Sequence, residues 1–253
     1  MGKLRVLDQV IRAYKDWPLY LAAYYGLVKR DITIRTRDGL SFTVRIDKGD
    51  LGPIGEVFHL RHYDPPQGEI RSGDIVIDIG AHMGYFSLHA ANKGAEVFAF
   101  EAFPEHCRHI KDHALQNGRV VRVFNEAISD MMGDMNFYIA KNNGCNSLYR
   151  KTDEKITVRG VTLKHIFERE QLDHCDYLKV DCEGAEYGIL MTLPDEVLSK
   201  IRRIVLEYHF GPEFGQPKEK PKQLKSFLEQ KGYRVEDVPV NPSNGMMYAV
   251  RTA

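Results

Sequence analysis

One sequence feature limits most strongly how this chain can fold. It is a predicted strand with an acid near its end, followed by a turn that contains two glycines and then by a helix. The apolar run 75–79 contains one acid, Asp78. Gly80 and Gly84 follow the run, and a helical stretch begins at Tyr85. Glycine allows positive φ and a close approach of the backbone to a ligand, and the first N–H groups of a helix can bind an anion. The pattern predicts an α/β protein with a ligand site at this turn.

Strands and helices alternate along the rest of the chain, which is typical of a Rossmann-like, doubly wound and mainly parallel sheet. We expect strands near 75–79, 96–101, 120–124, 177–181, 201–208, 233–238 and 247–251, and helices near 85–92, 104–117 and 221–231. Two further short strands, 136–140 and 155–159, flank Asn142-Asn143-Gly144. They predict an insertion over the carboxyl edge of the sheet, where such folds bind ligands.

Residues 1–70 are predicted to be a small cap on a main domain formed by 71–253, because they are too few to hold a good core alone. Helical spacing over 4–28 is interrupted at Pro18, a hairpin is expected around Arg37-Asp38-Gly39, and a short helix over 53–63. The uncharged run 17–28 is shorter than the roughly 20 residues that span a bilayer as helix. We expect it to pack on the main domain, in preference to contact with a membrane interface.

The charge balance and the cysteines limit which kinds of partner and which cellular compartment are expected. Lys+Arg and Asp+Glu both number 35, and a formal net charge of zero argues against a nucleic-acid partner. The cysteines form neither a C-x-x-C pair nor a zinc-like array; they are Cys107, Cys145, Cys175 and Cys182. With no signal peptide visible, we expect reduced thiols in a cytoplasmic protein.

The acid at the end of the second strand indicates which ligand the turn holds. Glu101 follows Gly84 by seventeen positions and is placed to accept two hydrogen bonds from a ribose diol. A dinucleotide site has G-x-G-x-x-G, but His82 stands at the second glycine and would crowd a pyrophosphate. An amino-acid tail tolerates that side chain, so S-adenosyl-L-methionine (SAM) is favoured over NAD. Asp78 is then placed to receive the ammonium of the tail, directly or through water.

Asn125-Glu126-Ala127 follows the third strand, which in such sheets lies beside the adenine. Glu126 could accept from the exocyclic amine and the N–H of Ala127 could donate to the ring; the alternative is a simple solvent-facing loop. The predicted cofactor-binding residues are Asp78, Gly80, Ala81, His82, Gly84, Tyr85, Phe86, Glu101, Ala102, Glu126, Ala127 and Asp181.

These motifs resemble those of the FkbM-type methyltransferases, within the class I SAM-dependent superfamily. The resemblance rests on segments 76–88, 100–105, 125–129, 146–148 and 176–187, and covers about 73–208. It implies a seven-stranded sheet with an antiparallel last strand. It also implies methyl transfer, often to oxygen, on hydroxyl groups of natural products or sugars, with S-adenosyl-L-homocysteine as the product. This chain has His82 where the family usually has Asn, and Cys182 where an aliphatic residue is usual.

Candidate catalytic residues follow the fourth and fifth strands. Asp181 and Glu183 close the fourth strand, and Glu207 and His209 alternate along the fifth, so the latter two face the same side. We expect Asp181 to orient the methionine end or the acceptor, and His209 or Glu183 to act as base. The structural alternatives are helix capping by Asp181 and Glu183, and an ordinary strand-end position for His209.

Asp181, Glu207 and His209 also suggest a divalent metal site, but without a second acid pair we favour a site without metal. Asn146, Ser147 and Glu207 are predicted to bind the acceptor, with 143–148 serving as a lid or only as a hairpin turn. The prediction is a SAM-dependent O-methyltransferase acting on a small-molecule or sugar hydroxyl. Two alternatives are an NAD-dependent oxidoreductase and a non-catalytic module that binds SAM or docks a partner through its aromatic N-terminal helix.

Overall fold

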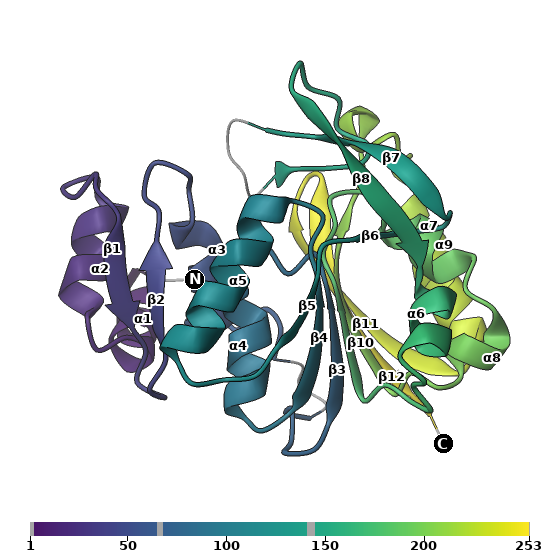
Figure 1. Cartoon of the computed structure of the whole chain (residues 1–253), viewed down its shortest axis with the longest axis horizontal. Coiled ribbons are helices and arrows are strands. Elements are labelled where there is room, and N and C mark those ends of the chain that lie inside the picture. The colour runs from purple at the N-terminus through teal and green to yellow at the C-terminus, as the bar shows by residue number, and fades with distance from the viewer. Residues whose placement is uncertain (1–2, 65–67, 141–144, 253) are drawn as a thin grey trace.

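The computed structural model describes residues 3–64, 68–140 and 145–252, and its centre is a seven-stranded sheet (Figure 1). The strands, in spatial order, are β11 (Tyr233–Asn241), β12 (Asn244–Arg251), β10 (Arg203–His209), β9 (Tyr177–Val180), β3 (Ile75–Ile79), β4 (Glu96–Phe100) and β5 (Arg122–Phe124). Neighbours from β10 to β5 are parallel, and β12 runs antiparallel to both β10 and β11. The predicted seven-stranded, mostly parallel sheet with an antiparallel last strand is confirmed.

Helices cover both faces of this sheet, because successive strand residues point to opposite sides. Ile77 and Ile79 of β3 belong to the core on one face, and Val76 belongs to the core on the other. Helices α4 (Tyr85–Asn92) and α5 (Pro104–Gln116) lie on the Val76 side (Figure 1). The opposite face is covered by α6 (Leu163–Arg169), α7 (Glu186–Met191), α8 (Asp195–Leu198) and α9 (Lys220–Gln230).

The N-terminal elements pack outside α4 and α5 and share their core. They are α1 (Lys3–Ala13), α2 (Trp17–Tyr24), the hairpin of β1 (Ile32–Arg35) and β2 (Ser41–Val44), and α3 (Leu51–Phe58). The ring of Phe42 contacts that of Tyr85 edge-on, with centroids 5.1 Å apart. The helix expected over 53–63 begins earlier, at Leu51, and ends at Phe58; the chain then turns at Arg61, which has a positive φ of 56°.

The insertion forms a second, three-stranded sheet that follows β5 at the carboxyl edge of the main one. Its strands are β6 (Ala127–Ser129), β7 (Gly133–Tyr138) and β8 (Lys155–Thr162), in the order β6-β8-β7. The predicted strand 136–140 overlaps only the end of β7, and 155–159 is the first part of β8, whereas β6 and the helix α6 were not predicted. Thr162 accepts a hydrogen bond from the N–H of His165 and so caps α6, a signal the sequence did contain. The expected turn Asn142-Asn143-Gly144 lies outside the described residues.

Two strands begin later in the chain than expected. Val120 is 84% exposed, and β5 begins only at Arg122; β10 begins at Arg203, after an isolated bridge between Cys175 and Ile201. Within the described ranges, none of the helices has the length and apolar character required to cross a membrane. All four cysteines are free thiols.

Candidate active site

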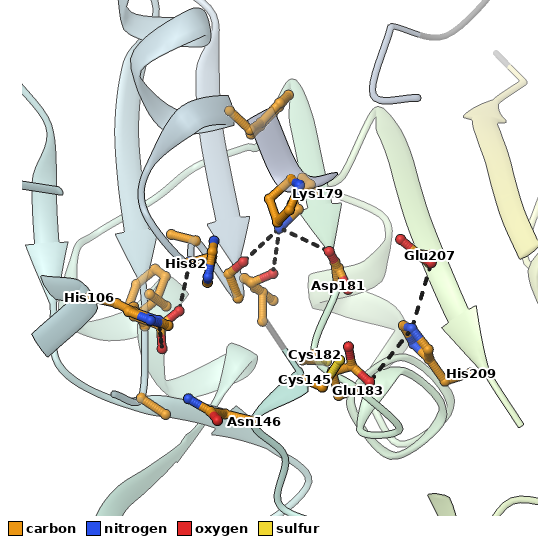
Figure 2. A pocket seen from close by; sticks show the side chains of 18 of the residues that line it. His82, His106, Cys145, Asn146, Lys179, Asp181, Cys182, Glu183, Glu207 and His209 are labelled. Atoms are coloured by element: carbon orange, nitrogen blue, oxygen red, sulfur yellow. Dashed lines mark hydrogen bonds and ion pairs between the residues drawn. The ribbon is translucent and has the colours of Figure 1, made fainter. Parts of the chain in front are cut away.

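A cavity of about 420 Å³ opens at the carboxyl ends of β3, β4, β9 and β10. Most of the predicted site residues form its wall: Gly80, Ala81, His82, Tyr85, Phe86, Glu101, Ala102, Glu126, Ala127, Asn146, Asp181, Glu183, Glu207 and His209. Figure 2 shows His82 and His106 on one side of this cavity and Asp181, Glu207 and His209 on the other. Asp78, Gly84 and Ser147 were also predicted, but they lie outside the wall and act on it indirectly.

The glycine turn passes very close to the end of β9. Gly80 has a φ of 76°, and a Cβ built on it would overlap the carbonyl oxygen of Asp181. Gly84 has a φ of 79°, and a Cβ built on it would lie 3.0 Å from the side chain of Ile110 on α5. Both positions therefore require glycine for backbone reasons. Gly84 shapes the start of α4, and Gly80 lets the turn meet the neighbouring strand inside the cavity.

Glu101 holds the glycine turn against the end of β4. Its carboxylate accepts hydrogen bonds from the N–H of His82 at 2.7 Å and from the N–H of Phe103 at 2.8 Å. Burial alone would raise its pKa, but His106 and these donors outweigh burial and lower it. The carboxylate is therefore ionised, and each oxygen retains lone pairs that can accept from a ligand.

His82 brings an uncharged ring into the wall. It has a φ of 51°, and burial lowers its pKa to about 3, helped by the nearby ring of His106. Neither ring nitrogen has a hydrogen-bond partner among the described residues. One nitrogen of a neutral imidazole donates and the other accepts, so the ring can serve either polarity of ligand group.

Asp78 does not have the position expected of an ammonium receptor for a ligand. It is fully buried, it accepts from Ser87 Oγ at 2.6 Å, and its Oδ1 lies 3.2 Å from Lys179 Nζ. A protein ammonium therefore occupies the place that we expected the amino-acid tail to take. Sequence reasoning missed Lys179, although a lysine inside an otherwise apolar strand needs a buried partner and is a signal in itself.

Lys179 connects three parts of the turn region (Figure 2). Its Nζ donates to the Gly80 carbonyl at 2.7 Å and lies 3.8 Å from Asp181 Oδ2. Burial would lower the pKa of Lys179, but Asp78 and Asp181 outweigh that effect and raise it. Tyr63 also donates to Asp181 Oδ2, at 2.8 Å. One oxygen of Asp181 is thus fixed by a residue that precedes the main sheet, which sequence reasoning also missed.

His209 lies among four carboxylates. Its Nδ1 is 3.0 Å from Glu186 Oε1, and its Nε2 is 3.7 Å from Glu207 and 3.9 Å from Glu183. Burial would lower the pKa of His209, but Glu186, Glu183 and Asp181 raise it to about 10. The ring therefore carries a proton at neutral pH in this arrangement. The prediction that His209 is the base finds no support in this geometry, and Glu183 is the better placed candidate.

Burial also changes the two other acids of the cluster. It raises the pKa of Glu183 to about 7, partly offset by His209, and that of Glu207 to about 9, with Asp181 as a further cause. Asn244 on β12 donates to Glu207 Oε1 at 2.6 Å. Both carboxyl groups therefore hold a proton more readily than an ordinary glutamate, and a cation or a set of hydroxyl donors would stabilise their ionised forms.

The remaining predicted residues are Glu126, Asn146 and Ser147. Glu126 is held by Arg169, whose Nη1 lies 2.9 Å from both carboxylate oxygens. Asn146 lines the cavity, and its Nδ2 is buried with no hydrogen-bond partner within the described part of the chain. Ser147 donates to the Glu183 carbonyl at 2.6 Å, so it holds the loop that carries Glu183.

Comparison with known proteins identifies the family of this chain. Residues 78–235, more than half of the chain, match the family model described as the methyltransferase FkbM domain. The 31-O-demethyl-FK506 methyltransferase FkbM of Streptomyces tacrolimicus is 28% identical over 188 residues, covering 61% of this chain and 72% of that protein. The hexuronic acid methyltransferase AglP of Haloferax volcanii is 24% identical over 198 residues, covering 74% and 78%.

Among solved structures, the Methanococcus jannaschii fibrillarin pre-rRNA processing protein aligns with a TM-score of 0.47 at 15% identity, over 72% of this chain and 68% of that one. The family match decides between the two cofactors considered for the glycine turn, and it removes the alternative of an NAD-dependent oxidoreductase. The chain belongs to the FkbM methyltransferase family and is a SAM-dependent methyltransferase.

Proposed function

We propose that this enzyme transfers the methyl group of SAM to a hydroxyl oxygen of a small molecule or sugar. The observation that carries the proposal is the cluster of carboxyl groups at one end of the cavity, formed by Asp181, Glu183 and Glu207. Carboxyl groups accept hydrogen bonds from hydroxyls and can take up the proton that an alcohol loses on methylation. The names of two relatives, a 31-O-demethyl-FK506 methyltransferase and a hexuronic acid methyltransferase, support an oxygen-rich acceptor.

The cofactor fits the opposite end of the same cavity. We place the ribose at Glu101, the adenine near Ala102 and Ala127, and the amino-acid tail between Gly80 and His82. Glu126 is already held by Arg169, so we assign the adenine contact to the backbone of Ala127 rather than to that carboxylate. In that orientation the methyl group would face Asp181 and the acid cluster.

Methyl transfer is an in-line displacement that needs the acceptor oxygen close to the methyl carbon, with water excluded. As the new O–C bond forms, the C–S bond breaks and the sulfur keeps its electron pair, which yields S-adenosyl-L-homocysteine. The hydroxyl proton passes to Glu183, while Asp181, fixed by Tyr63 and Lys179, orients the acceptor. Asn146 offers its free buried Nδ2–H to another acceptor oxygen.

We also propose that residues 1–70 are a cap that completes this cavity and are not a separate domain. Gly52, Pro53 and Glu56 of α3 and Tyr63 beyond it belong to the cavity wall. Tyr63 reaches across to Asp181, and the cap shares one apolar core with α4 and α5. A fragment starting at residue 71 would therefore lack part of the acceptor site.

A labelled-methyl assay tests the function. The protein is incubated with isotopically labelled SAM and a panel that contains hexuronic acids, neutral sugars, macrolide alcohols, and matched amines and thiols, and products are identified by mass spectrometry. We expect a methyl ether on an alcohol acceptor, which survives mild alkali, whereas a methyl ester is hydrolysed. Label found only in esters, amines, thiols or on carbon contradicts the proposal. SAM binding without transfer to any acceptor, including a whole metabolite extract, would favour the non-catalytic module.

A further inference from the structure

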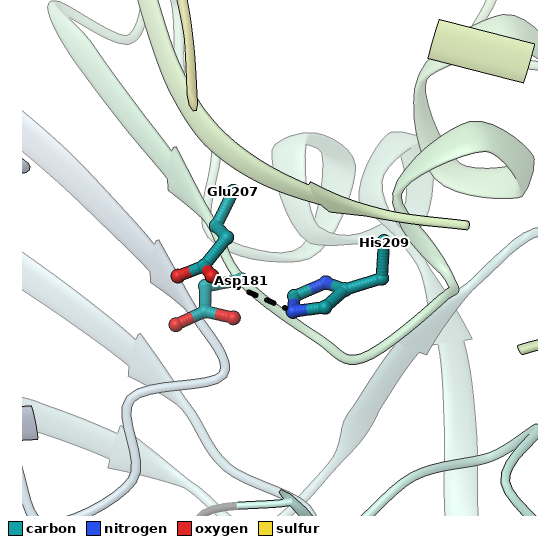
Figure 3. A group of neighbouring side chains, drawn as sticks. All are labelled: Asp181, Glu207 and His209. Carbon is teal, nitrogen blue, oxygen red and sulfur yellow. Dashed lines mark ion pairs between the residues drawn. The ribbon is translucent and has the colours of Figure 1, made fainter. Parts of the chain in front are cut away.

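Three side chains at the ends of β9 and β10 bring metal-binding atoms together (Figure 3). Asp181 follows β9 directly, and Glu207 and His209 alternate on β10 and so share a face. One ligand atom from each lies within 4.8 Å of the others. Oxygen ligands at about 2.1 Å from one octahedral ion are separated by about 3–4 Å, so small side-chain rotations would bring all three onto one ion.

A second observation comes from the orientation of His209. Its side chain is 7% exposed, and Nδ1 is committed to Oε1 of the fully buried Glu186. Nε2 points toward Glu207 and Asp181 (Figure 3); it lies 3.7 Å from Glu207 and 3.9 Å from Glu183, beyond hydrogen-bond distance of either. A histidine that donates one ring nitrogen to a carboxylate and leaves the other free is the usual arrangement of a metal ligand.

Glu186 is itself fixed in place, so this orientation is built into the fold. Its Oε1 accepts from the N–H of Cys182 at 3.2 Å, and both of its oxygens accept from the N–H of Gly184 at 3.1 Å. The same carboxylate therefore anchors the loop that carries Asp181 and the ring of His209. Two of the three candidate ligands are positioned by one buried residue.

The charges around the cluster leave room for a cation. Lys179 lies 3.8 Å from Asp181, but its ammonium is already engaged by Asp78 and the Gly80 carbonyl. Glu207 receives one hydrogen bond from Asn244, whose amide oxygen is buried and has no hydrogen-bond partner in the described part of the chain. A divalent ion bound here would displace the proton from Nε2 of His209, since an imidazole ligand must be neutral, and would relieve the repulsion between the two carboxylates.

We infer that Asp181, Glu207 and His209 bind one divalent metal ion that holds the acceptor hydroxyl, which reverses our expectation from sequence of a site without metal. Two carboxylates favour hard ions and the imidazole favours a transition metal, so the set fits Mn²⁺ better than Ca²⁺. An ion there would make the hydroxyl more acidic and would leave Glu183 to accept its proton. The inference rests on the proposed function, since it assigns the acceptor to this end of the cavity.

Metal binding is measured on the full chain, without SAM or acceptor. After dialysis against a chelator, Mn²⁺ is titrated by calorimetry, and pulsed electron paramagnetic resonance detects nitrogen coupling to the bound ion. We expect one ion per chain, with Asp181→Asn, Glu207→Gln and His209→Gln each weakening binding tenfold or more. The nitrogen signal should vanish in His209→Gln alone. Glu96→Gln, an exposed acid at the opposite end of β4, should bind like the wild type.

Circular dichroism and thermal unfolding show whether each variant is folded, so loss of metal binding is not mistaken for unfolding. Failure of the wild type to bind Mn²⁺, Mg²⁺ or Zn²⁺ overturns the inference, and so does an affinity that none of the three substitutions changes. Full methyl transfer by the chelator-treated enzyme also overturns it while the proposed function stands. Binding of the ion by an enzyme that methylates no hydroxyl would instead contradict the proposed function.

Discussion

The ring of His209 and the carboxylate of Glu186 form a buried pair, with Nδ1 3.0 Å from Oε1. Glu186 is fully buried on the first turn of α7, and His209 is the last residue of β10. The pair couples the loop after β9 to the neighbouring strand, because Glu186 also accepts from the N–H of Cys182 and Gly184. The geometry of the whole acid cluster therefore depends on one carboxylate that does not line the cavity.

Glu186→Gln tests this dependence. The amide keeps an acceptor for the backbone but loses the negative charge that fixes the histidine ring, so we expect Mn²⁺ affinity to fall about tenfold. SAM affinity, measured by calorimetry, should stay within threefold of the wild type, since the cofactor end is unchanged. Equal Mn²⁺ affinity in the two proteins would show that Glu186 has only a structural role.

Gly80→Ala tests the close approach between the glycine turn and β9. The methyl group would overlap the Asp181 carbonyl, and φ is positive, so we expect a loss of about 2–5 kcal/mol in the free energy of unfolding. Gly26→Ala is the matched control, because Gly26 also has a positive φ but a Cβ there meets nothing within 4 Å. We expect that control to lose only about 1–2 kcal/mol in urea denaturation. Equal losses in the two variants would contradict the close approach.

The sequence predicted the main sheet and the glycine turn because their signals are local. The apolar run of β3, the glycines after it and the proline that starts α5 each act over a few residues. Two boundaries moved although propensity favoured the longer elements: α3 ends at Phe58, before Leu60 and Arg61, and β5 starts at Arg122, after two valines. The carboxyl ends of parallel strands meet at one edge, so the expectation that Asp181 and His209 would lie near each other needed no more than the strand order.

Contacts between distant segments could not be predicted in the same way. Tyr63 bonds Asp181 only because the cap folds back over the sheet, and Lys179 faces Asp78 only because β9 pairs with β3. The histidine that looked like a base is surrounded by carboxylates, so its pKa is raised rather than left near neutrality. Residue type alone could not show which of several acids and bases would hold the proton.

Glu101→Ala tests the ribose contact. The variant loses charge-assisted hydrogen bonds worth about 1.5–3 kcal/mol, which corresponds to a fall in SAM affinity of about ten- to a hundredfold. It also frees the N–H groups of His82 and Phe103, which loosens the glycine turn. Calorimetry measures the effect, with Glu96→Gln, at the first residue of β4, as the control. Wild-type affinity in Glu101→Ala would remove this residue from the cofactor site.

The ion pairs of His89 on α4 should make the stability of the fold depend on pH. Its ring lies 3.6 Å from Asp38 and 3.6 Å from Asp64, and Lys93 is 3.8 Å from Asp64. Burial would lower the pKa of His89, but the two carboxylates outweigh burial and raise it. The charged ring therefore stabilises the fold fully below its ordinary pKa of about 6.5, and this contribution is lost as pH rises through the raised value.

We therefore expect His89→Gln to be about 1 kcal/mol less stable than the wild type at pH 6, and the difference to shrink toward pH 9. Urea denaturation of both proteins at the two pH values measures it. All other titrating groups are present in both proteins. Any change with pH in the difference between their free energies of unfolding therefore comes from His89. A gap that is constant or wider at pH 9 would contradict the ion-pair arrangement.

Glu183→Gln tests the assignment of the base. Glu183 has a positive φ of 54°, its loop is held by Ser147, and its carboxyl group belongs to the cavity wall beside His209. Loss of a positioned base should reduce kcat by about 10²–10⁴, whereas the affinity for SAM should stay within threefold. A merely structural role would lower turnover equally for every acceptor. A more acidic hydroxyl needs less help to lose its proton, so the loss in kcat should be smaller for a phenol-like acceptor than for an aliphatic alcohol. An equal loss in kcat for both acceptors would assign the proton to another group.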